Sequence, residues 1–234
     1  MRLRHLPHQC ITLARVALHR LLHGGKPMLK FDWTSRHREH WMAALGGLAD
    51  RPVDVLEIGS YEGGSALFFL DALPLAHVTC VDLFSPRRSA TFDHNVSRHS
   101  GRVTKLPGRS AAVLDRLLAD GRRYDVIYVD GSHRRIDVMV DSVLAWGLLQ
   151  IGGIIIWDDY LLDPAEPPAK RPQHAIDAFF TAFRPCLHEL HRDYQIIARK
   201  TAEWPEPAPS HAGKDDLVQD ERGLDVVVGR AGAG

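Results

Sequence analysis

Acidic side chains recur in this sequence directly after short apolar runs, where they could bind hydroxyl groups or a cation. Five of them stand at such positions: Glu57, Asp82, Asp130, Asp158 and Asp159. If neighbouring strands bring Asp130, Asp158 and Asp159 together, the like charges raise each other's pKa values. A hard divalent cation removes that conflict, and oxygen ligands without cysteine favour Mg²⁺, Mn²⁺ or Ca²⁺ over Zn²⁺. These three carboxylates therefore predict a metal site.

A glycine turn follows the first of these apolar runs and indicates a nucleotide-like cofactor. Residues 53–58 alternate apolar and β-branched side chains, Gly59 and Gly63 turn the chain, and residues 66–70 read as a helix. Such a turn lets the backbone approach a ligand closely, and the helix start offers free N–H groups. Alone, the pattern also fits a dehydrogenase or a plain tight turn, and Asp158-Asp159 alone fits a solvated loop or a helix N-cap.

The elements that must position these residues alternate between strand and helix. The predicted strands are residues 53–58, 76–82, 102–106, 124–129 and 153–157, followed by 188–193 and 194–199. Apolar strands that alternate with helices are typical of a parallel sheet covered on both faces. The last two are joined too tightly for a crossover and predict an antiparallel pair. The predicted fold is therefore α/β, a doubly wound Rossmann-like, mostly parallel sheet with a terminal antiparallel strand, in a single domain.

The chain ends differ in composition from this central part. Residues 1–48 are predicted as an N-terminal helical extension, 49–200 as the domain that carries the site, and 201–234 as a low-complexity, mobile C-terminal tail. In the extension, residues 1–25 are amphipathic and could lie on a membrane surface or pack on the domain or a second subunit. Residues 33–48 read as a helix, and residues 224–228 could form a short strand.

Composition limits the classes of partner. The 29 basic residues balance the 29 acidic ones, so no global field attracts nucleic acid. No apolar run is long and unbroken enough to span a bilayer. The three cysteines lie far apart without a CxxC motif, which argues against a disulfide framework or a zinc site and favours the cytoplasm.

Together these residues resemble the class I S-adenosylmethionine-dependent methyltransferases. The resemblance is carried by residues 57–66, Asp82, residues 108–110, Asp130 and Asp158-Asp159. Within that class the chain is most similar to the metal-dependent catechol O-methyltransferase type, which shares Tyr61. Residues 128–133 with 157–160 resemble a bacterial branch of macrolide-sugar O-methyltransferases and proteins named cephalosporin hydroxylases. The resemblance spans residues 50–200.

The resemblance implies a role for each of these positions. The cofactor-binding residues would be Glu57, Gly59, Ser60, Tyr61, Gly63, Ser65, Asp82, Ser110 and Asp130. Among them, Asp82 would bind both ribose hydroxyls of S-adenosyl-L-methionine and Ser110 would lie near the adenine. Asp130, Asp158 and Asp159 would hold the metal, with Mg²⁺ favoured, and His133 would be the general base.

The predicted function is metal-dependent transfer of a methyl group to a hydroxyl of a small molecule, such as a glycoside, a sugar or another natural product. Coordination to a divalent cation lowers the pKa of such a hydroxyl, and an imidazole can remove its proton near neutral pH. The N-terminal helices are also a candidate surface for a homo-oligomer. Two alternatives stay open. One is a non-catalytic S-adenosylmethionine- or nucleotide-binding protein, and the other is an NAD-dependent oxidoreductase, although Gly59-x3-Gly63 is not a GxGxxG motif.

Overall fold

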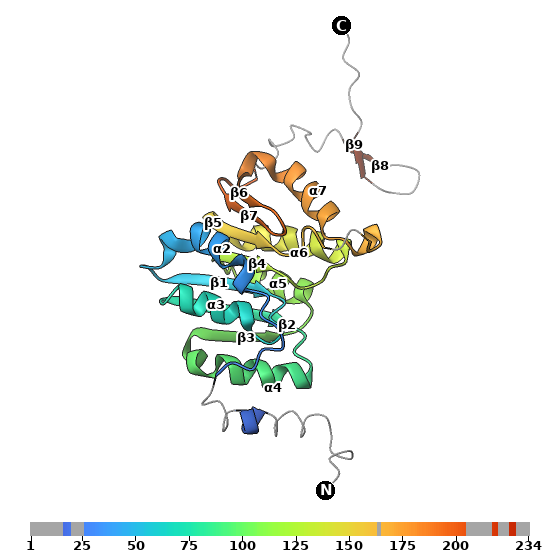
Figure 1. Cartoon of the computed structure of the whole chain (residues 1–234). Coiled ribbons are helices and arrows are strands. Elements are labelled where there is room, and N and C mark those ends of the chain that lie inside the picture. The colour runs from blue at the N-terminus through green and yellow to red at the C-terminus, as the bar shows by residue number, and fades with distance from the viewer. Residues whose placement is uncertain (1–15, 20–25, 163–164, 205–216, 220–224, 228–234) are drawn as a thin grey trace, which may run out of the picture. The chain divides into compact units, whose positions relative to one another are not determined.

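The computed structural model describes residues 16–19, 26–162, 165–204, 217–219 and 225–227. It divides into two units, residues 1–203 and 204–234. The first unit is built around a seven-stranded sheet, and the second contains a pair of short strands (Figure 1).

The central sheet has the strand order β3-β2-β1-β4-β5-β7-β6. Its strands are β1 (Val53–Ile58), β2 (Ala76–Asp82), β3 (Val103–Pro107), β4 (Tyr124–Val129), β5 (Leu149–Trp157), β6 (Leu187–Arg192) and β7 (Ile196–Lys200). The first five strands pair in parallel, and β7 pairs antiparallel with both β5 and β6. The predicted doubly wound sheet with an antiparallel end is confirmed. Strand order reverses between β1 and β4, which is where open sheets of this kind bind ligands.

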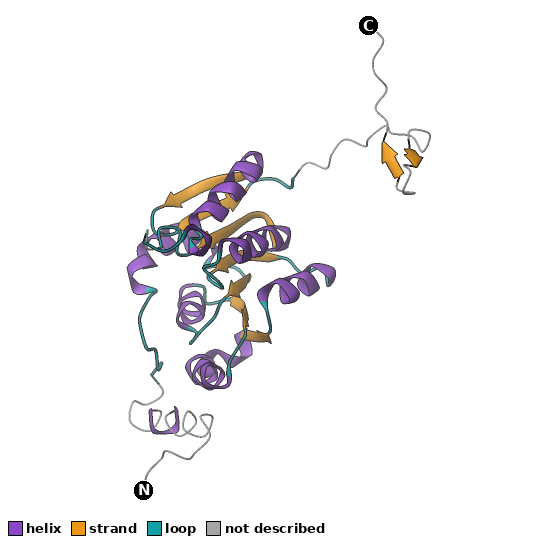
Figure 2. Cartoon of the chain, turned by 90° about the vertical axis from the view of Figure 1, so that its right-hand side faces the viewer, coloured by secondary structure: helices purple, strands orange, loops and turns teal. Residues whose placement is uncertain are grey.

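Helices cover both faces of this sheet (Figure 2). One face carries α2 (Arg38–Leu45), α3 (Gly64–Ala72) and α4 (Pro86–Asn95), and the other carries α5 (Ser110–Ala119), α6 (Arg135–Leu148) and α7 (Gln173–Phe183). The short 3₁₀ helices are η2 (Ser35–His37), η3 (Gly46–Leu48), η4 (Val96–Arg102), η5 (Pro168–Lys170) and η6 (Arg184–Cys186). Because both faces are covered, every residue of β4 is buried.

The core consists of two hydrophobic clusters, one on each face of the sheet. The cluster under α2, α3 and α4 contains Trp41, whose side chain is fully buried. Its ring stacks on Phe69 with centroids 5.1 Å apart and meets Tyr128 edge-on at 5.0 Å. Helix α2, which belongs to the predicted N-terminal extension, is therefore part of the core.

Two elements differ in detail from the sequence prediction. The predicted helix over residues 33–48 is divided into η2, α2 and η3, and η3 begins at the Gly46-Gly47 pair, which disfavours a regular helix. Strand β5 begins at Leu149, four residues before its predicted start at Gly153. Gly152 has φ +83°, and the pairing of β4 with β5 shifts register before Val126. The sequence indicates a break at these glycines, whereas the strand continues through an irregularity.

The chain ends are described only in part. Residues 16–19 are helical, and the rest of the amphipathic segment 1–25 lies outside the described residues. In the second unit, β8 (Leu217–Gln219) pairs antiparallel with β9 (Asp225–Val227), which falls within the strand expected at 224–228. Among the described residues, every helix is too short or too polar to cross a bilayer. Cys80 and Cys186 are buried without a disulfide, and Cys10 lies outside the described residues.

Candidate active site

The glycine turn after β1 folds the chain directly against the end of β4. Gly59 has φ +94°, and a Cβ there would lie 1.9 Å from the carbonyl oxygen of Asp130. Gly63, with φ +84°, is the N-cap of α3, and its N–H donates to the carbonyl oxygen of Ser60 at 2.7 Å. Both conformations favour glycine, and at position 59 no other side chain fits. The predicted cofactor turn and the predicted metal ligand Asp130 are thus in contact.

Asp82 ends β2 and braces this turn. Its Oδ2 accepts a hydrogen bond from the Tyr61 N–H at 3.0 Å, and its Oδ1 accepts one from the Phe84 N–H at 2.9 Å. Tyr61 and Phe84 both have φ of +45°, which is uncommon for bulky residues. The Arg88 guanidinium lies 4.6 Å from the centre of the Tyr61 ring. The predicted contacts of Asp82 with ribose hydroxyls would use the remaining lone pairs of this carboxylate.

Glu57 and Ser60 carry buried polar atoms that lack a partner. The Oε1 atom of Glu57 accepts a hydrogen bond from the Ser65 hydroxyl. Burial raises the pKa of Glu57. Its Oε2 and the Ser60 Oγ are buried and make no hydrogen bond of good geometry among the described residues, although Ser60 and Cys80 lie close enough to Glu57 to oppose the rise in its pKa. Because unpaired buried polar atoms cost free energy, this corner fits a ligand that donates hydrogen bonds, such as the ammonium group of an amino-acid moiety.

Ser110 begins α5 and forms a hydrogen bond with a residue that the sequence did not single out. Asp141 on α6 is only 1% exposed. Burial raises the pKa of Asp141 to about 6, although a hydrogen bond with Ser110 opposes the rise. A Cβ on Gly131 would lie 3.3 Å from Asp141 Oδ2. Asp141 therefore connects two segments of the predicted site, and its one sequence signal is an acidic residue on the buried face of an amphipathic helix.

Asp130 and Asp158 lie side by side because β4 and β5 pair in parallel up to the residues that precede them. The Tyr128 hydroxyl lies between the two carboxylates, 3.3 Å from Asp130 Oδ2 and in a short hydrogen bond to Asp158 Oδ2. Burial first, and then the neighbouring carboxylates with Asp158 foremost, raise the pKa of Asp130 well above its usual value. Tyr128 thus belongs to the candidate site, although the sequence assigned it no role there beyond its place in the motif 128–133.

Asp159 and Asp158 have different hydrogen-bond partners. Its Oδ2 lies 2.7 Å from Nδ1 of His133, and its Oδ1 accepts a hydrogen bond from the Tyr194 hydroxyl at 2.7 Å. The hydrogen bond that His133 donates to Asp159, opposed by burial, raises the pKa of His133. Burial would raise the pKa of Asp159, but the hydrogen bonds from His133 and Tyr194 outweigh it and lower that pKa. The two side chains therefore form an Asp–His pair that leaves His133 Nε2 free of Asp159.

The segment that contains these residues matches a known protein family. Residues 56–160 match the family model described as "Methyltransferase domain". This segment is a methyltransferase domain. It includes every site residue predicted from the sequence, from Glu57 to Asp159. No curated protein sequence matches the chain significantly.

The solved structures with the same fold include methyltransferases of low sequence identity. The MycE methyltransferase of the mycinamycin biosynthetic pathway, solved with Mg, SAH and mycinamycin VI, has a TM-score of 0.58 and 17% identity over 90% of this chain. The chain spans 58% of the length of MycE. The O-methyltransferase TomG from Streptomyces achromogenes, involved in tomaymycin synthesis and solved with SAM, has a TM-score of 0.59 and 17% identity, covering 82% of this chain and 90% of its own. An O-methyltransferase from Bacillus cereus in complex with SAH has a TM-score of 0.60 and 16% identity, covering 82% and 91%.

These matches confirm the resemblance to class I methyltransferases that the sequence indicated. Two of the solved structures with this fold, TomG and the Bacillus cereus protein, are named O-methyltransferases, and at 16–17% identity their likeness establishes the fold. The individual roles of the cofactor residues, of His133 and of the metal ligands stay predictions, as do the domain boundaries at residues 48 and 200.

The charges of the carboxylates in the methyltransferase domain favour a bound cation, but among the described residues their positions do not form a complete set of metal ligands. Asp130 and Asp158 face each other across the Tyr128 hydroxyl, and their repulsion is the kind that a divalent cation relieves. Asp159 is engaged with His133 and Tyr194. Within the described part of the chain, no three His, Cys, Asp or Glu side chains are grouped so that they could hold a metal ion. Asp130 and Asp158 are therefore the residues that fit a metal best, and the three-carboxylate site stays a prediction.

The chain that precedes α2 crosses the outer side of the glycine turn. The Met28 N–H donates to Asn95 Oδ1 at 2.6 Å, and the Asn95 amide donates to the Glu62 carbonyl oxygen at 2.7 Å. The Lys30 N–H donates to Glu62 Oε2 at 2.7 Å. These contacts attach the N-terminal segment to the turn of the methyltransferase domain.

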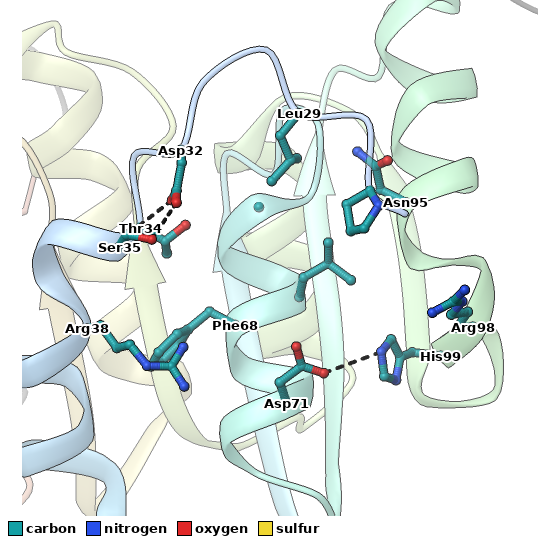
Figure 3. Close-up of a pocket in the computed structure, with 13 residues that line it drawn as sticks. Leu29, Asp32, Thr34, Ser35, Arg38, Phe68, Asp71, Asn95, Arg98 and His99 are labelled. Atoms are coloured by element: carbon teal, nitrogen blue, oxygen red, sulfur yellow. Dashed lines mark hydrogen bonds and ion pairs between the residues drawn. The ribbon is translucent and has the colours of Figure 1, made fainter. Parts of the chain in front are cut away.

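A pocket of about 340 Å³ lies beside α3, between this N-terminal segment and η4 (Figure 3). Asp71 and His99 form an ion pair at 3.5 Å at one end of it, and Arg38 lies 5.5 Å from the centre of the Phe68 ring. None of the site residues predicted from the sequence lines this pocket. It is therefore separate from the site at the strand ends.

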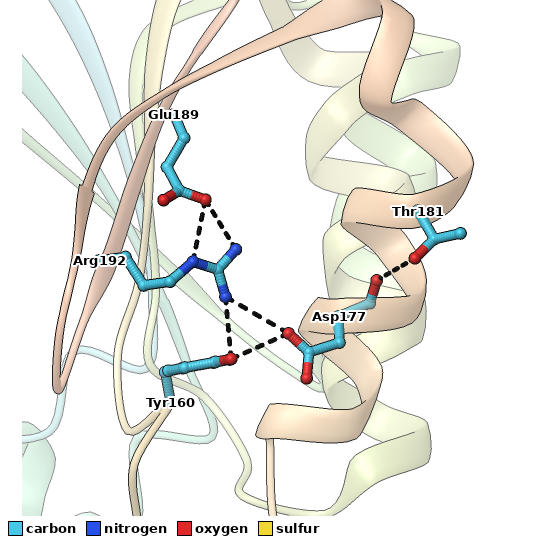
Figure 4. Close-up of polar contacts among 5 residues, drawn as sticks. All are labelled: Tyr160, Asp177, Thr181, Glu189 and Arg192. Atoms are coloured by element: carbon cyan, nitrogen blue, oxygen red, sulfur yellow. Dashed lines mark hydrogen bonds and ion pairs between the residues drawn. The ribbon is translucent and has the colours of Figure 1, made fainter.

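A polar network holds the chain directly after Asp159 (Figure 4). The Tyr160 hydroxyl donates to Asp177 Oδ1 at 2.9 Å and accepts a hydrogen bond from Arg192 at 2.8 Å. Arg192 also forms two hydrogen bonds with Glu189, at 2.9 and 2.7 Å. Because Tyr160 follows the paired aspartates in the chain, this network limits their movement.

Proposed function

We propose that this protein transfers a methyl group from S-adenosyl-L-methionine to a hydroxyl group of a small molecule, with a divalent metal, Mg²⁺ in preference, at the acceptor side. The favoured acceptors are sugars, glycosides and other natural products. The observation that carries the proposal is the junction of two half-sites at one sheet edge. The glycine turn contacts the Asp130 backbone through Gly59, and Asp130 lies beside Asp158.

The donor half-site is formed by the turn after β1 and the ends of β2 and β4. The unpaired Glu57 Oε2 and Ser60 Oγ support binding of the ammonium group of the donor. Asp82, held in place by two backbone N–H groups, supports binding of the ribose hydroxyls. Since the sulfonium methyl group is already activated, the main task of these residues is to align it with the acceptor oxygen.

The acceptor half-site contains the Asp159–His133 pair. The Asp159 carboxylate accepts a hydrogen bond from Nδ1 of His133, so the opposite nitrogen, Nε2, can take the proton of the acceptor hydroxyl. The His133 side chain is 53% exposed, which leaves room for a substrate. Asp159 stabilises the imidazolium that results, as the carboxylate does in other Asp–His pairs.

Asp130 and Asp158 are the residues proposed to hold the metal. A bound divalent cation lowers the pKa of a coordinated hydroxyl and orients vicinal oxygens. Asp130 contributes a partly buried carboxylate whose raised pKa reflects desolvation and its neighbours, and Asp158 contributes the carboxylate across the Tyr128 hydroxyl. MycE, which has the same fold, was solved in complex with Mg, which supports the choice of metal.

The second candidate is a non-catalytic S-adenosylmethionine-binding protein. It is favoured by the absence of a three-ligand metal group among the described residues, since cofactor binding alone needs only the glycine turn and Asp82. An NAD-dependent oxidoreductase, the third class, finds no support in the family match, which is to a methyltransferase domain.

A labelled-methyl screen tests the proposal. The full chain is incubated with methyl-labelled S-adenosylmethionine, Mg²⁺ and a panel of glycosides, phenols and vicinal diols, and donor binding is measured in parallel by calorimetry. We expect label on a hydroxyl of at least one class, and no transfer in EDTA while donor binding persists. Donor binding without transfer to any acceptor would favour the non-catalytic alternative, and full turnover in EDTA would remove the metal from the proposal.

The base is tested by His133→Gln, which keeps a polar side chain and removes the imidazole. Loss of a general base lowers the rate by about 10² to 10⁴-fold. We expect that loss in kcat with unchanged affinity for the donor. A variant as active as the unmodified chain at every pH would exclude His133 as the base.

A further inference from the structure

The N-terminal segment that precedes the methyltransferase domain holds the ring of Tyr194. The His37 ring stacks on it with centroids 5.8 Å apart and 20° between the planes. The Arg36 guanidinium carbon lies 5.0 Å from the centre of the same ring. Arg36 and His37 belong to η2, whereas Tyr194 lies in the turn between β6 and β7. A segment far from Tyr194 in the sequence therefore fixes the plane of its ring.

The hydroxyl end of the same ring reaches the candidate active site. It donates a hydrogen bond to Asp159 Oδ1 at 2.7 Å, and the other oxygen of that carboxylate is bonded to His133 Nδ1 at 2.7 Å. The contacts therefore run without a gap from η2 through Tyr194 and Asp159 to His133.

Tyr194 also holds the backbone next to Asp159. Its carbonyl oxygen accepts a hydrogen bond from the Tyr160 N–H at 2.9 Å. Asp159 itself has φ +58°, a left-handed conformation that costs free energy for a residue other than glycine. Such a conformation persists only where neighbouring groups stabilise it. Tyr194 does this through two hydrogen bonds, one from its hydroxyl to the Asp159 side chain and one from the Tyr160 N–H to its carbonyl oxygen.

A second contact attaches the residue after Tyr194 to the same N-terminal segment. The indole N–H of Trp41 donates to Gln195 Oε1 at 2.6 Å, and both side chains are buried. Trp41 lies one helical turn after His37. Consecutive residues of the turn between β6 and β7 are thus each held by η2 or α2.

We propose that Tyr194 is a positioning residue for the Asp159–His133 pair. Residues 36–41 of the N-terminal segment contribute to the site by holding Tyr194 in place. The catalytic consequence rests on the proposed function, whereas the effect on the geometry of His133 does not. A contact that only stabilised the fold would change melting and leave the state of His133 and kcat unaltered.

The first test needs no turnover. Tyr194→Phe keeps the ring between Arg36 and His37 and removes only the hydroxyl donor. In the full chain labelled with ¹⁵N-histidine, the Nδ1 resonance of His133 is identified by its absence in His133→Gln, and we expect it to shift in Tyr194→Phe. Tyr124→Phe is the matched control, because the Tyr124 hydroxyl, at the start of β4, is buried without a hydrogen-bond partner among the described residues. A His133 resonance that moves in neither variant overturns the proposal.

The second test measures kinetics with an acceptor from the screen. Loss of a group that orients a working residue typically lowers activity by about 10 to 100-fold. We expect that fall in kcat for Tyr194→Phe and for His37→Ala, with affinity for S-adenosylmethionine within about twofold. His37→Phe, which restores a stacking ring, should recover most of the rate.

An unchanged kcat in Tyr194→Phe, or an equal loss of donor affinity, would overturn the proposal. Absence of any transfer by the unmodified chain, together with a shifted His133 resonance in Tyr194→Phe, would refute the proposed function and support the positioning contact.

Discussion

Replacing Asp141 with Asn should make the protein more stable relative to the unmodified chain as the pH rises from 4 to 7. Asp141 is 1% exposed, and burial raises its pKa from 3.8 to about 6. A carboxyl whose folded-state pKa is raised binds its proton more tightly in the folded chain. Below pH 3.8 both states hold that proton, and no free energy of unfolding is lost.

Between pH 3.8 and 6 the unfolded chain ionises Asp141 while the folded chain resists, so the free energy of unfolding falls with pH. Above pH 6 both states are ionised and the loss is complete. The rise in the pKa of Asp141 from 3.8 to about 6 corresponds to a loss of roughly 3 kcal/mol in the free energy of unfolding, which is an upper value for a single buried group. Asp141→Asn has nearly the same shape and cannot ionise, so it escapes this loss.

The assay is urea unfolding of both chains at pH 4.5, 5.5 and 7. We expect the difference in free energy of unfolding, Asp141→Asn minus unmodified, to grow by about 1 to 3 kcal/mol across this range. Asp115→Asn, on the exposed side of α5, controls for the general effect of removing one carboxylate. A difference that stays constant with pH, or that has the opposite sign, would refute the reasoning from burial.

Two further substitutions test the turn and the N-terminal contact. Gly59→Ala should abolish binding of S-adenosylmethionine in calorimetry, because the added methyl group would lie 1.9 Å from a backbone oxygen, whereas Gly46→Ala, where no atom lies within 4 Å, should bind normally. Trp41→Phe should lower the free energy of unfolding by about 1–3 kcal/mol more than Trp146→Phe, because it leaves Gln195 Oε1 buried without its donor. The Trp146 indole N–H is buried without a hydrogen-bond partner in the part of the chain that the structure describes, so its loss breaks no such bond, and equal losses in the two variants would contradict the prediction.

Much of the fold could be predicted because its signals are local. The strands at 76–82 and 124–129 agree with the structure at both ends, since buried strands carry their periodicity in consecutive residues. The start of β5 was predicted too late because Gly152 and Gly153 read as a break, and only pairing with β4 shows that the strand continues. The division of residues 33–48 likewise depends on how this segment packs.

Some residues of the candidate site could likewise be predicted from the sequence, and others could not. Asp82, Asp130 and Asp158 could be singled out from the sequence, because parallel strands carry their carboxyl ends to a single edge and each of these residues ends or follows a strand. His133 was indicated by the family resemblance. The partners of these residues could not be found in that way. Tyr128 reads as an interior strand residue, and Asp141 reads as a polar residue on a helix; the structure shows which carboxylate or hydroxyl each one meets.

By itself, the sequence determined the sheet, the glycine turn and the row of carboxylates at one edge, because each depends on residues that are neighbours in the chain. Only the tertiary structure decided that Asp159 pairs with His133 and Tyr194, and that Trp41 reaches Gln195 across 154 residues of sequence. Such contacts arise when separate elements are packed around one core, and no local pattern of residues records which of them will meet.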